Sequence, residues 1–445
     1  MRDLSPESRP RKFVQWLLEL DRSEPQHSDQ ELAALVERDY RWNFAVNLGD
    51  GTTFWLAMSF LGNTTIVPLF LSKLTPSMLP IGYAAMLAQA GWFLPQLFTA
   101  NWVEQMPRRK PVAVNLGLVL ERLPVLFLAL TALLAGRWTG LALASFLIMY
   151  TWNRLGGGVI ATAWQDLIAR VIPLERRGLF WGLTTAIGAA LGFGGAALSA
   201  WLLTAYAFPT NFAIVFSLAA VILLGGWFFS ALIREPAYPV SAPKQGQREF
   251  LRHLPQLIRQ DRPFRRFLVA RMLLTLSVMG LGFITVAAVQ RWGVADGTVG
   301  LYTGVLLLGQ TVGNLTFGLL ADRRGHKSSL EWAGVAYCLA FALAWLSPDA
   351  AWYYLVFFLL GAGQGIVIVS GILVVLEFCE PQRRPTYVGL TNTAVGLVGV
   401  TGPLVAAWLA GVDYGLLFAI CAAISLMAWV AMRWWVQEPR WVGRR

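Results

Sequence analysis

The chain has 445 residues, of which 56% are hydrophobic and only 14% are charged. Soluble globular proteins have about a quarter of their residues charged, so this composition excludes an ordinary soluble domain. The formal net charge of +11 does not indicate nucleic-acid binding, because the basic residues alternate with long apolar runs along the chain.

The apolar runs predict twelve transmembrane helices. A helix that crosses a bilayer needs roughly 20 apolar residues. Residues 178–233 contain no Asp, Glu, Lys or Arg; this stretch is too long for one crossing, so we expect it to turn back at Ala205–Asn211. Apolar length and turn signals place the helices at 44–71, 79–103, 111–135, 139–167, 178–205, 209–233, 265–290, 298–321, 328–347, 352–377, 387–410 and 414–435.

The basic residues predict the orientation of these helices. They cluster in alternate segments between the apolar runs, whereas the intervening turns contain only Lys73, Arg137 and Arg291. By the positive-inside rule, this asymmetry predicts a multi-pass protein of the cytoplasmic (inner) membrane, with both termini in the cytoplasm and basic side chains at the lipid headgroups.

The chain contains an internal repeat. An offset of 218 residues aligns Gly82 with Gly300, Gly91 with Gly309, Glu104 with Asp322 and Arg109 with Lys327. A Pro-rich and charged linker separates the halves. The predicted parts are a cytoplasmic N-terminal segment (1–43), a six-helix bundle (44–233), a cytoplasmic linker (234–264), a second six-helix bundle (265–435) and a cytoplasmic tail (436–445).

The stretch Gly318–Lys327, GLLADRRGHK, concentrates charge between almost wholly apolar flanks, and Ala100–Lys110 is its degenerate copy in the first half. It resembles the cytoplasmic loop signature of the major facilitator superfamily, roughly Gly-x-Leu-Ala-Asp-Arg-x-Gly-Arg-Lys, with His326 in place of a basic residue. The resemblance covers the whole chain. It implies an all-α membrane protein with twelve transmembrane helices in two pseudo-symmetric six-helix bundles.

The same resemblance implies a cytoplasmic gate between the bundles. Asp322 should face the start of the fifth helix near Arg177, and Glu104 the start of the eleventh near Arg384, because helix N-termini offer unpaired N–H groups and partial positive charge. These contacts would hold the cytoplasmic side shut while the outside is open. We expect Gly318 to allow close helix packing and Gly325 to adopt positive φ. The basic members, Arg108, Arg109, Arg323, Arg324 and Lys327, are expected to reach lipid phosphates, and a role in topology alone is the alternative.

Polar side chains at membrane depth are costly and therefore mark a candidate substrate or proton pathway. In this superfamily the first, fourth, seventh and tenth helices line the central cavity, so the resemblance favours Asp50, Asn153, Arg154 and Gln364. Arg154 and the glycines after it resemble an Arg-x-x-x-Gly signature of proton antiporters. We expect Arg154 to point inward, within one water of Asp50 or of bound substrate; a structural arginine is the alternative.

Glu121 and Arg122 are further candidates for this pathway. As sequence neighbours on the third helix they point about 100° apart, so each needs a partner on another helix or water. The third helix of the superfamily packs behind the cavity, which favours a structural role for both.

The predicted function is a secondary active transporter of a small organic solute by alternating access, with proton-coupled efflux as one form and import or facilitated movement of a small organic anion as the alternative. A non-transporting receptor or scaffold with the same fold is an alternative of another class. No metalloprotease, nucleophile-elbow or P-loop pattern is present, so the protein is not expected to be an enzyme or to bind a cofactor or metal. Its expected partners are a small-molecule substrate, protons and the lipid bilayer but no nucleic acid, and we expect a monomer.

Overall fold

The computed structural model describes residues 17–19, 27–239, 259–379 and 384–439. Helices account for almost all of these residues, and no strand occurs among them, so the predicted all-α fold class is confirmed. The first half contains α2 (Asp29–Phe60), α3 (Ile66–Leu74), α4 (Leu79–Phe93), α5 (Gln96–Glu104), the π-helices η1 (Pro111–Leu116) and η2 (Leu118–Arg122), α6 (Leu123–Leu134), α7 (Thr139–Val171), α8 (Leu174–Ala205) and α9 (Thr210–Ala231). The second half contains α11 (Arg262–Ser277), the 3-10 helix η3 (Leu281–Phe283), α12 (Ile284–Trp292), α13 (Asp296–Arg324), α14 (His326–Leu346), α15 (Trp352–Glu377), α16 (Arg384–Val412), α17 (Tyr414–Val430) and the π-helix η5 (Ala431–Trp435).

Nine helical segments within the described ranges are long and apolar enough to cross a membrane. The other three predicted spans, the first, second and fourth, coincide with α2 and α3, α4 and α5, and α7. α2 and α7 have polar residues in their middle and are therefore less apolar than the other nine segments. α4 and α5 are each too short to cross a membrane alone, because the helix is interrupted between them. The protein is therefore a multi-pass membrane protein, and each of the twelve predicted spans corresponds to a helical segment.

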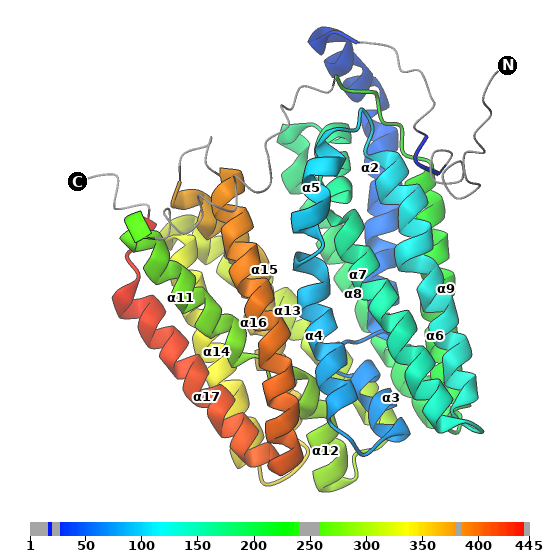
Figure 1. The fold of residues 1–445 in the computed structure, drawn as a ribbon, viewed down its shortest axis with the longest axis vertical. Helices are drawn as coiled ribbons and strands as arrows, with labels where there is room; N and C mark the ends of the chain where they lie inside the picture. The colour runs from blue at the N-terminus through cyan, green and yellow to red at the C-terminus, as the bar shows by residue number, and fades with distance from the viewer. Residues whose placement is uncertain (1–16, 20–26, 240–258, 380–383, 440–445) are drawn as a thin grey trace, which may run out of the picture.

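The helices form two bundles that lie side by side (Figure 1). The elements α2 to α9 make the first bundle, and α11 to η5 make the second. Between the bundles α4 packs against α16, and α8 packs against α13. Glycines permit this close approach: a Cβ at Gly82 would lie 2.7 Å from the carbonyl oxygen of Pro403, and one at Gly300 would lie 2.5 Å from the backbone of Ala200.

Three predicted spans are not continuous helices, so the prediction was wrong at these places: the second is interrupted at 94–95, and the first and seventh have longer breaks. The breaks, 61–65 and 278–283, lie at equivalent positions of the 218-residue repeat. A broken helix leaves backbone groups without intrahelical partners. Here the other bundle provides a partner, because Thr285 Oγ1 donates to the carbonyl oxygen of Thr64 at 2.8 Å, while the hydroxyls of Thr65 and Thr303 are 2.7 Å apart.

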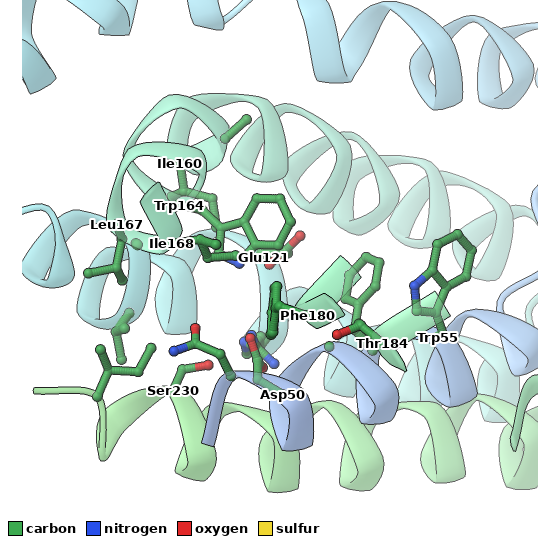
Figure 2. Close-up of a pocket in the computed structure, with 18 of the residues that line it drawn as sticks. Asp50, Trp55, Glu121, Ile160, Trp164, Leu167, Ile168, Phe180, Thr184 and Ser230 are labelled. Atoms are coloured by element: carbon green, nitrogen blue, oxygen red, sulfur yellow. The ribbon is translucent and has the colours of Figure 1, made fainter. Parts of the chain in front are cut away.

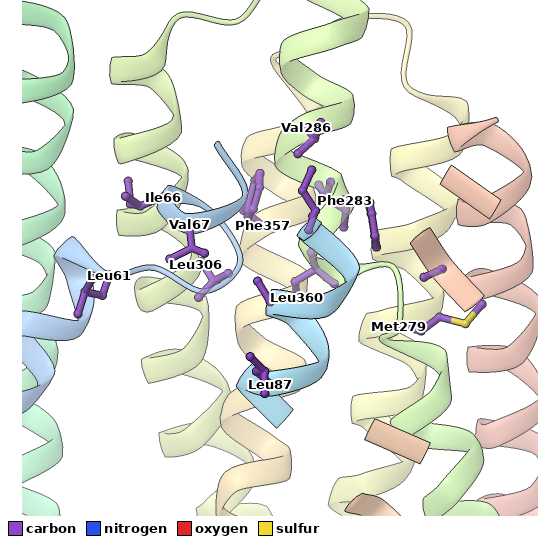
Figure 3. Close-up of a cluster of buried hydrophobic side chains, with 14 of the residues drawn as sticks. Leu61, Ile66, Val67, Leu87, Met279, Phe283, Val286, Leu306, Phe357 and Leu360 are labelled. Atoms are coloured by element: carbon purple, nitrogen blue, oxygen red, sulfur yellow. The ribbon is translucent and has the colours of Figure 1, made fainter. Parts of the chain in front are cut away.

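Buried apolar side chains of both bundles form a cluster that includes Ile66, next to Thr65 in the chain (Figure 3). Ile66 and Val67 of α3 lie toward Leu306 of α13 and toward Phe357 and Leu360 of α15, and all five side chains are buried. An ion pair at the same end also joins the bundles, with 2.8 Å between Lys73 Nζ and Asp296 Oδ1. At the opposite end, where α2 begins, Glu104 is exposed. The described structure is therefore closed at the α3 and α12 end.

We expect the Lys73–Asp296 ion pair to favour this closed arrangement. Partly exposed ion pairs contribute about 0.2–1 kcal/mol, so Lys73→Gln should open this end in up to about fivefold more molecules. The measurement is the rate of maleimide labelling of Thr303→Cys in a background without the three native cysteines. Arg137→Gln, which removes an exposed charge from the turn between α6 and α7, is the control. If Thr303→Cys is labelled at the same rate alone, with Lys73→Gln and with Arg137→Gln, the ion pair does not favour the closed arrangement.

Candidate functional site

A cavity of about 140 Å³ lies inside the first bundle (Figure 2). Residues of α2, α4, α7, α8 and α9 and of the π-helices η1 and η2 line it. Its walls are mainly aromatic and aliphatic. The polar side chains among them include Asp50 and Glu121, and the aromatic ones are Phe54, Trp55, Trp92, Trp164, Phe180 and Trp181.

Asp50 forms a buried ion pair with Arg122. The Nη2 of Arg122 lies 2.9 Å from Asp50 Oδ1, and only 8% and 9% of the two side chains are exposed. The Nη1 of Arg122 donates to the carbonyl oxygen of Leu223 at 2.7 Å. Asp50 was expected near Arg154 from the sequence, but in the structure it pairs with Arg122 instead. The charges of Asp50 and Arg122 thus compensate each other.

Glu121 lines the same cavity, but it has a different environment (Figure 2). Adjacent helical residues diverge, so Glu121 does not share the ion pair of Arg122. In the described part of the chain no hydrogen bond or ion pair is formed by the Glu121 carboxylate; the charged groups that act on it electrostatically are Arg122, Arg154 and Asp50. This acid therefore faces an aromatic cavity without a bonded counter-ion.

Pro124 interrupts the hydrogen bonding of the third span next to Glu121. Proline has no N–H, so the carbonyl of Leu120, four residues earlier, loses its helical donor. Gly156 of α7 lies against this carbonyl, where any Cβ would overlap the oxygen. The amide of Asn153 donates to the next carbonyl, that of Glu121, at 2.6 Å. A single π-type turn in a helix is frequent at functional sites, and the π-helix η2 contains Glu121.

A second proline has the same effect on α4. Pro95 separates α4 from α5 and removes the donor for the carbonyl of Gly91, and Gly158 of α7 packs directly against that carbonyl. Gly157, between the two packing glycines, faces Glu121, since a Cβ there would lie 3.2 Å from its Oε1. The glycines after Arg154 therefore act in this structure as a packing surface for two proline-interrupted helices, and they set the space beside Glu121.

Arg154 and Gln364 lie outside this cavity. The guanidinium of Arg154 is 5.0 Å from the ring centre of Tyr150, and its buried Nε has no hydrogen-bond partner in the described structure. Gln364 is half-buried in α15 of the second bundle. Four of the six predicted pathway residues therefore lie in or beside this cavity. Asp50, Glu121 and Arg122 line it, and Asn153 donates a hydrogen bond to the backbone of Glu121.

Glu235, which follows α9, is a further buried carboxylate that was not among the residues predicted from the sequence. Its carboxylate accepts hydrogen bonds from the backbone N–H groups of Arg109 and Lys110, at 2.9 and 2.8 Å, where the third span begins. Burial raises the pKa of Glu235, although these N–H groups oppose the rise. Glu438 lies in the equivalent place of the second half, against Gly325 before α14. A sequence signal for these two glutamates was present, because Arg-Glu-Pro at 234–236 is repeated as Gln-Glu-Pro at 437–439.

The predicted lipid contacts of Arg109 and Lys327 are wrong. Both side chains are buried: Arg109 Nε lies 2.6 Å from Asp166, and Lys327 Nζ lies 2.6 Å from Glu331. Each of these basic groups forms an ion pair with a carboxylate of its own bundle and therefore does not reach the lipid. Arg323 is exposed as expected.

The other gate residues have mixed outcomes. Gly325 has a φ of +93°, as predicted. Gly318 does not allow a close approach, because the nearest atom to a Cβ there would be a methyl group of Val369 at 3.9 Å. Arg177 donates to the carbonyl of Ile172 at 3.0 Å and so caps the end of α7. Arg108 lies 4.0 Å from Glu19. The side chains of Asp322 and Arg384 lie outside the described structure.

These features define a class of protein: an all-helical, multi-pass membrane protein made of two bundles. The two bundles have helix breaks at equivalent places, and the first contains buried charges. The family model for the Major Facilitator Superfamily matches residues 267–443. Residues 267–443, which form most of the second bundle, are therefore similar to members of this superfamily.

Relatives and solved structures agree with this assignment. The chain is 25% identical over 148 residues to the inner membrane metabolite transport protein YdjE of Escherichia coli (strain K12), a match that covers 32% of each chain. It is 26% identical over 171 residues to organic cation/carnitine transporter 7 of Arabidopsis thaliana, covering 38% of this chain and 33% of the relative. These matches thus span about a third of the length of the curated relatives. The crystal structure of a D-xylose-proton symporter superposes with a TM-score of 0.67 at 14% identity, covering 90% of this chain and 99% of the other, which shows a shared fold.

Proposed function

We propose that the protein is a secondary transporter that moves a small organic solute across the cytoplasmic membrane by alternating access. The broken first and seventh helices, the hydrogen bonds between Thr64, Thr65, Thr285 and Thr303, and the Lys73–Asp296 ion pair support this proposal. Together they close one end by contacts between two bundles that could separate as bodies. In the opposite arrangement, Glu104 and Asp322 would meet the N-termini of α16 and α8.

The solute class is a small organic cation, and Glu121 is the residue that would bind it. The observation behind this choice is a carboxylate with no bonded counter-ion in an aromatic cavity. An ammonium group would pair with the carboxylate, and the faces of Trp55, Trp164 and Trp181 would add cation–π attraction. A proton would neutralise the same carboxylate when no cation is bound, so exchange of a proton for the solute would follow from competition for one site.

Glu121, rather than Asp50, is the expected coupling residue. Asp50 already holds Arg122, and a solute that bound Asp50 would have to break a buried ion pair. By the same argument Arg122 does not offer a free positive charge to an anion. The alternative of a small organic anion therefore depends on Arg154, whose Nε lacks a hydrogen-bond partner in the described structure.

The test uses the purified protein in proteoliposomes that contain a pH-sensitive dye. We expect one or more small amines from a panel, but not the small carboxylates, to cause proton movement. Glu121→Gln should reduce this movement at least about tenfold, because a charge-assisted hydrogen bond contributes roughly 1.5–3 kcal/mol. Glu175→Gln, which neutralises an exposed carboxylate in the first turn of α8, is the matched control.

Three results would contradict the proposal. Unchanged proton movement in Glu121→Gln would remove Glu121 from the site. Movement with carboxylates alone, lost on replacement of Arg154 by Gln, would favour the anion alternative. No flux of any solute, with the fold intact, would favour a receptor or scaffold.

A further inference from the structure

A second cavity, of about 530 Å³, lies on the second bundle. It is located where α13 ends, α14 begins and η5 follows α17, at the end of the molecule where α2 also begins (Figure 1). Its charged and aromatic lining residues are Arg324, Lys327, Glu331, Trp332, Trp429 and Arg433, together with Glu438.

The ionisable side chains of this cavity leave positive charge uncompensated. Glu331 forms an ion pair with Lys327, with 2.6 Å between Oε1 and Nζ, and its Oε2 lies 3.8 Å from Nη1 of Arg433. The Glu438 carboxylate lies against Gly325. Lys327 is buried, so it cannot reach a ligand, but 58% of the Arg433 side chain is exposed. Arg324 is exposed and forms no ion pair within the described ranges. Two guanidinium groups are thus available at the cavity mouth.

Two tryptophans, Trp332 and Trp429, line the same cavity as these two arginines. Trp332 lines the cavity and is 51% exposed. Trp429, which also lines the cavity, packs edge-on against Trp434 with 5.2 Å between ring centres. Tryptophan concentrates at the membrane–water interface, where its ring lies among the acyl chains and its N–H among the headgroups. The aromatic side chains therefore place the mouth of this cavity at headgroup depth.

We infer that the cavity binds the phosphate of an anionic phospholipid such as phosphatidylglycerol. Arginine presents paired N–H donors that fit phosphate oxygens, and Arg324 and Arg433 reach the mouth from different helices. Leu320, Val335 and the tryptophans provide an apolar wall for the first part of an acyl chain. A free phosphate ion would gain nothing from that wall, so the lipid is the ligand that uses both features.

The experiment is native mass spectrometry of the full-length protein in detergent, titrated with phosphatidylglycerol or with phosphatidylcholine of the same acyl chains. Each basic residue near an anionic surface contributes a factor of about five to binding. We therefore expect wild type to bind phosphatidylglycerol roughly tenfold or more tightly than phosphatidylcholine, and Arg324→Gln/Arg433→Gln to lose this preference.

Two variants serve as controls. Arg323→Gln removes an exposed arginine next to Arg324 that does not line the cavity, so it should keep the preference. Arg324→Lys/Arg433→Lys retains the charge without the planar guanidinium and should keep a reduced preference. It remains informative if the double glutamine variant does not fold.

Equal binding of the two lipids by wild type would overturn the inference, as would an equal loss of preference in Arg323→Gln. Inorganic phosphate at millimolar concentration is a separate arm of the test. If it displaces phosphatidylglycerol and also binds alone with similar affinity, the cavity is a site for soluble phosphate, and the lipid assignment is wrong.

Discussion

Asp50→Asn is expected to destabilise the protein by about 3–5 kcal/mol, because it leaves the guanidinium of Arg122 buried without its counter-ion. The pair is nearly inaccessible, with 2.9 Å between its charged atoms, and the other hydrogen bond of Arg122, to Leu223, is to a neutral carbonyl. Asp50 is a candidate pathway residue by sequence, and a role in the pathway alone would let Asp50→Asn stop transport while the fold stays intact. The position of Arg122 changes that expectation, since loss of transport in this variant would follow from loss of the fold.

A double-mutant cycle separates the two effects. Replacement of a buried ion pair by apolar residues of similar volume is often neutral, so Asp50→Leu/Arg122→Met should recover most of the stability lost in either single variant. The measurement is the thermal unfolding of purified protein in detergent. Additive losses in the double variant would show that the two residues do not stabilise the fold as a pair.

Two adjacent glycines of α9 provide a matched control for the same site. A Cβ at Gly226 would lie 2.6 Å from Thr53 Oγ1 and 3.2 Å from both Asp50 Oδ1 and Arg122 Nη1. A Cβ at Gly225 would meet no atom within 4 Å. Gly226→Ala should therefore lower the unfolding temperature by displacing the ion pair, whereas Gly225→Ala should leave it unchanged or slightly higher.

The sequence was sufficient to predict the fold class, the repeat and the approximate spans, because apolar length and basic turns are local properties. It was not sufficient to predict the breaks at 61–65 and 278–283. These depend on a tertiary partner, since the carbonyl of Thr64 has its donor, Thr285, in the other bundle. A pattern of residues along one chain segment does not show that such a donor will be available.

The candidate site illustrates a similar limit. Hydropathy gives the depth of Asp50, Glu121 and Arg154 in the membrane, but the rotation of each helix decides which side chains meet. Asp50 consequently meets Arg122, which the sequence assigned to packing behind the cavity. A usable signal was nevertheless present in Pro95 and Pro124. Each proline releases the carbonyl four residues earlier, and a glycine on a neighbouring helix is the residue that can pack against it.

Gly158→Ala is the substitution with the second large expected effect. The added methyl would overlap the carbonyl oxygen of Gly91 and would lie 2.8 Å from Cγ of Pro95, and both groups belong to a backbone with little freedom to move. Overpacking of this kind costs about 1–3 kcal/mol, and more where backbone must shift, so we expect about 3 kcal/mol or more here. The control is Gly140→Ala on the same helix, where a Cβ would meet nothing within 4 Å and should cost nothing.

Gly157→Ala then distinguishes packing from function within the same three glycines. Its Cβ would lie 3.2 Å from Oε1 of Glu121, which is the far end of a flexible side chain, so the carboxylate can move aside and the fold should keep nearly its full stability. A displaced carboxylate would bind a cation less well, so solute-dependent proton movement should fall severalfold while the unfolding temperature stays within a few degrees of wild type. Both quantities are measured on one preparation, beside Gly158→Ala. Normal proton movement in Gly157→Ala would mean that the position of the Glu121 carboxylate does not limit transport, because the added methyl, 3.2 Å from Oε1, requires the carboxylate to shift.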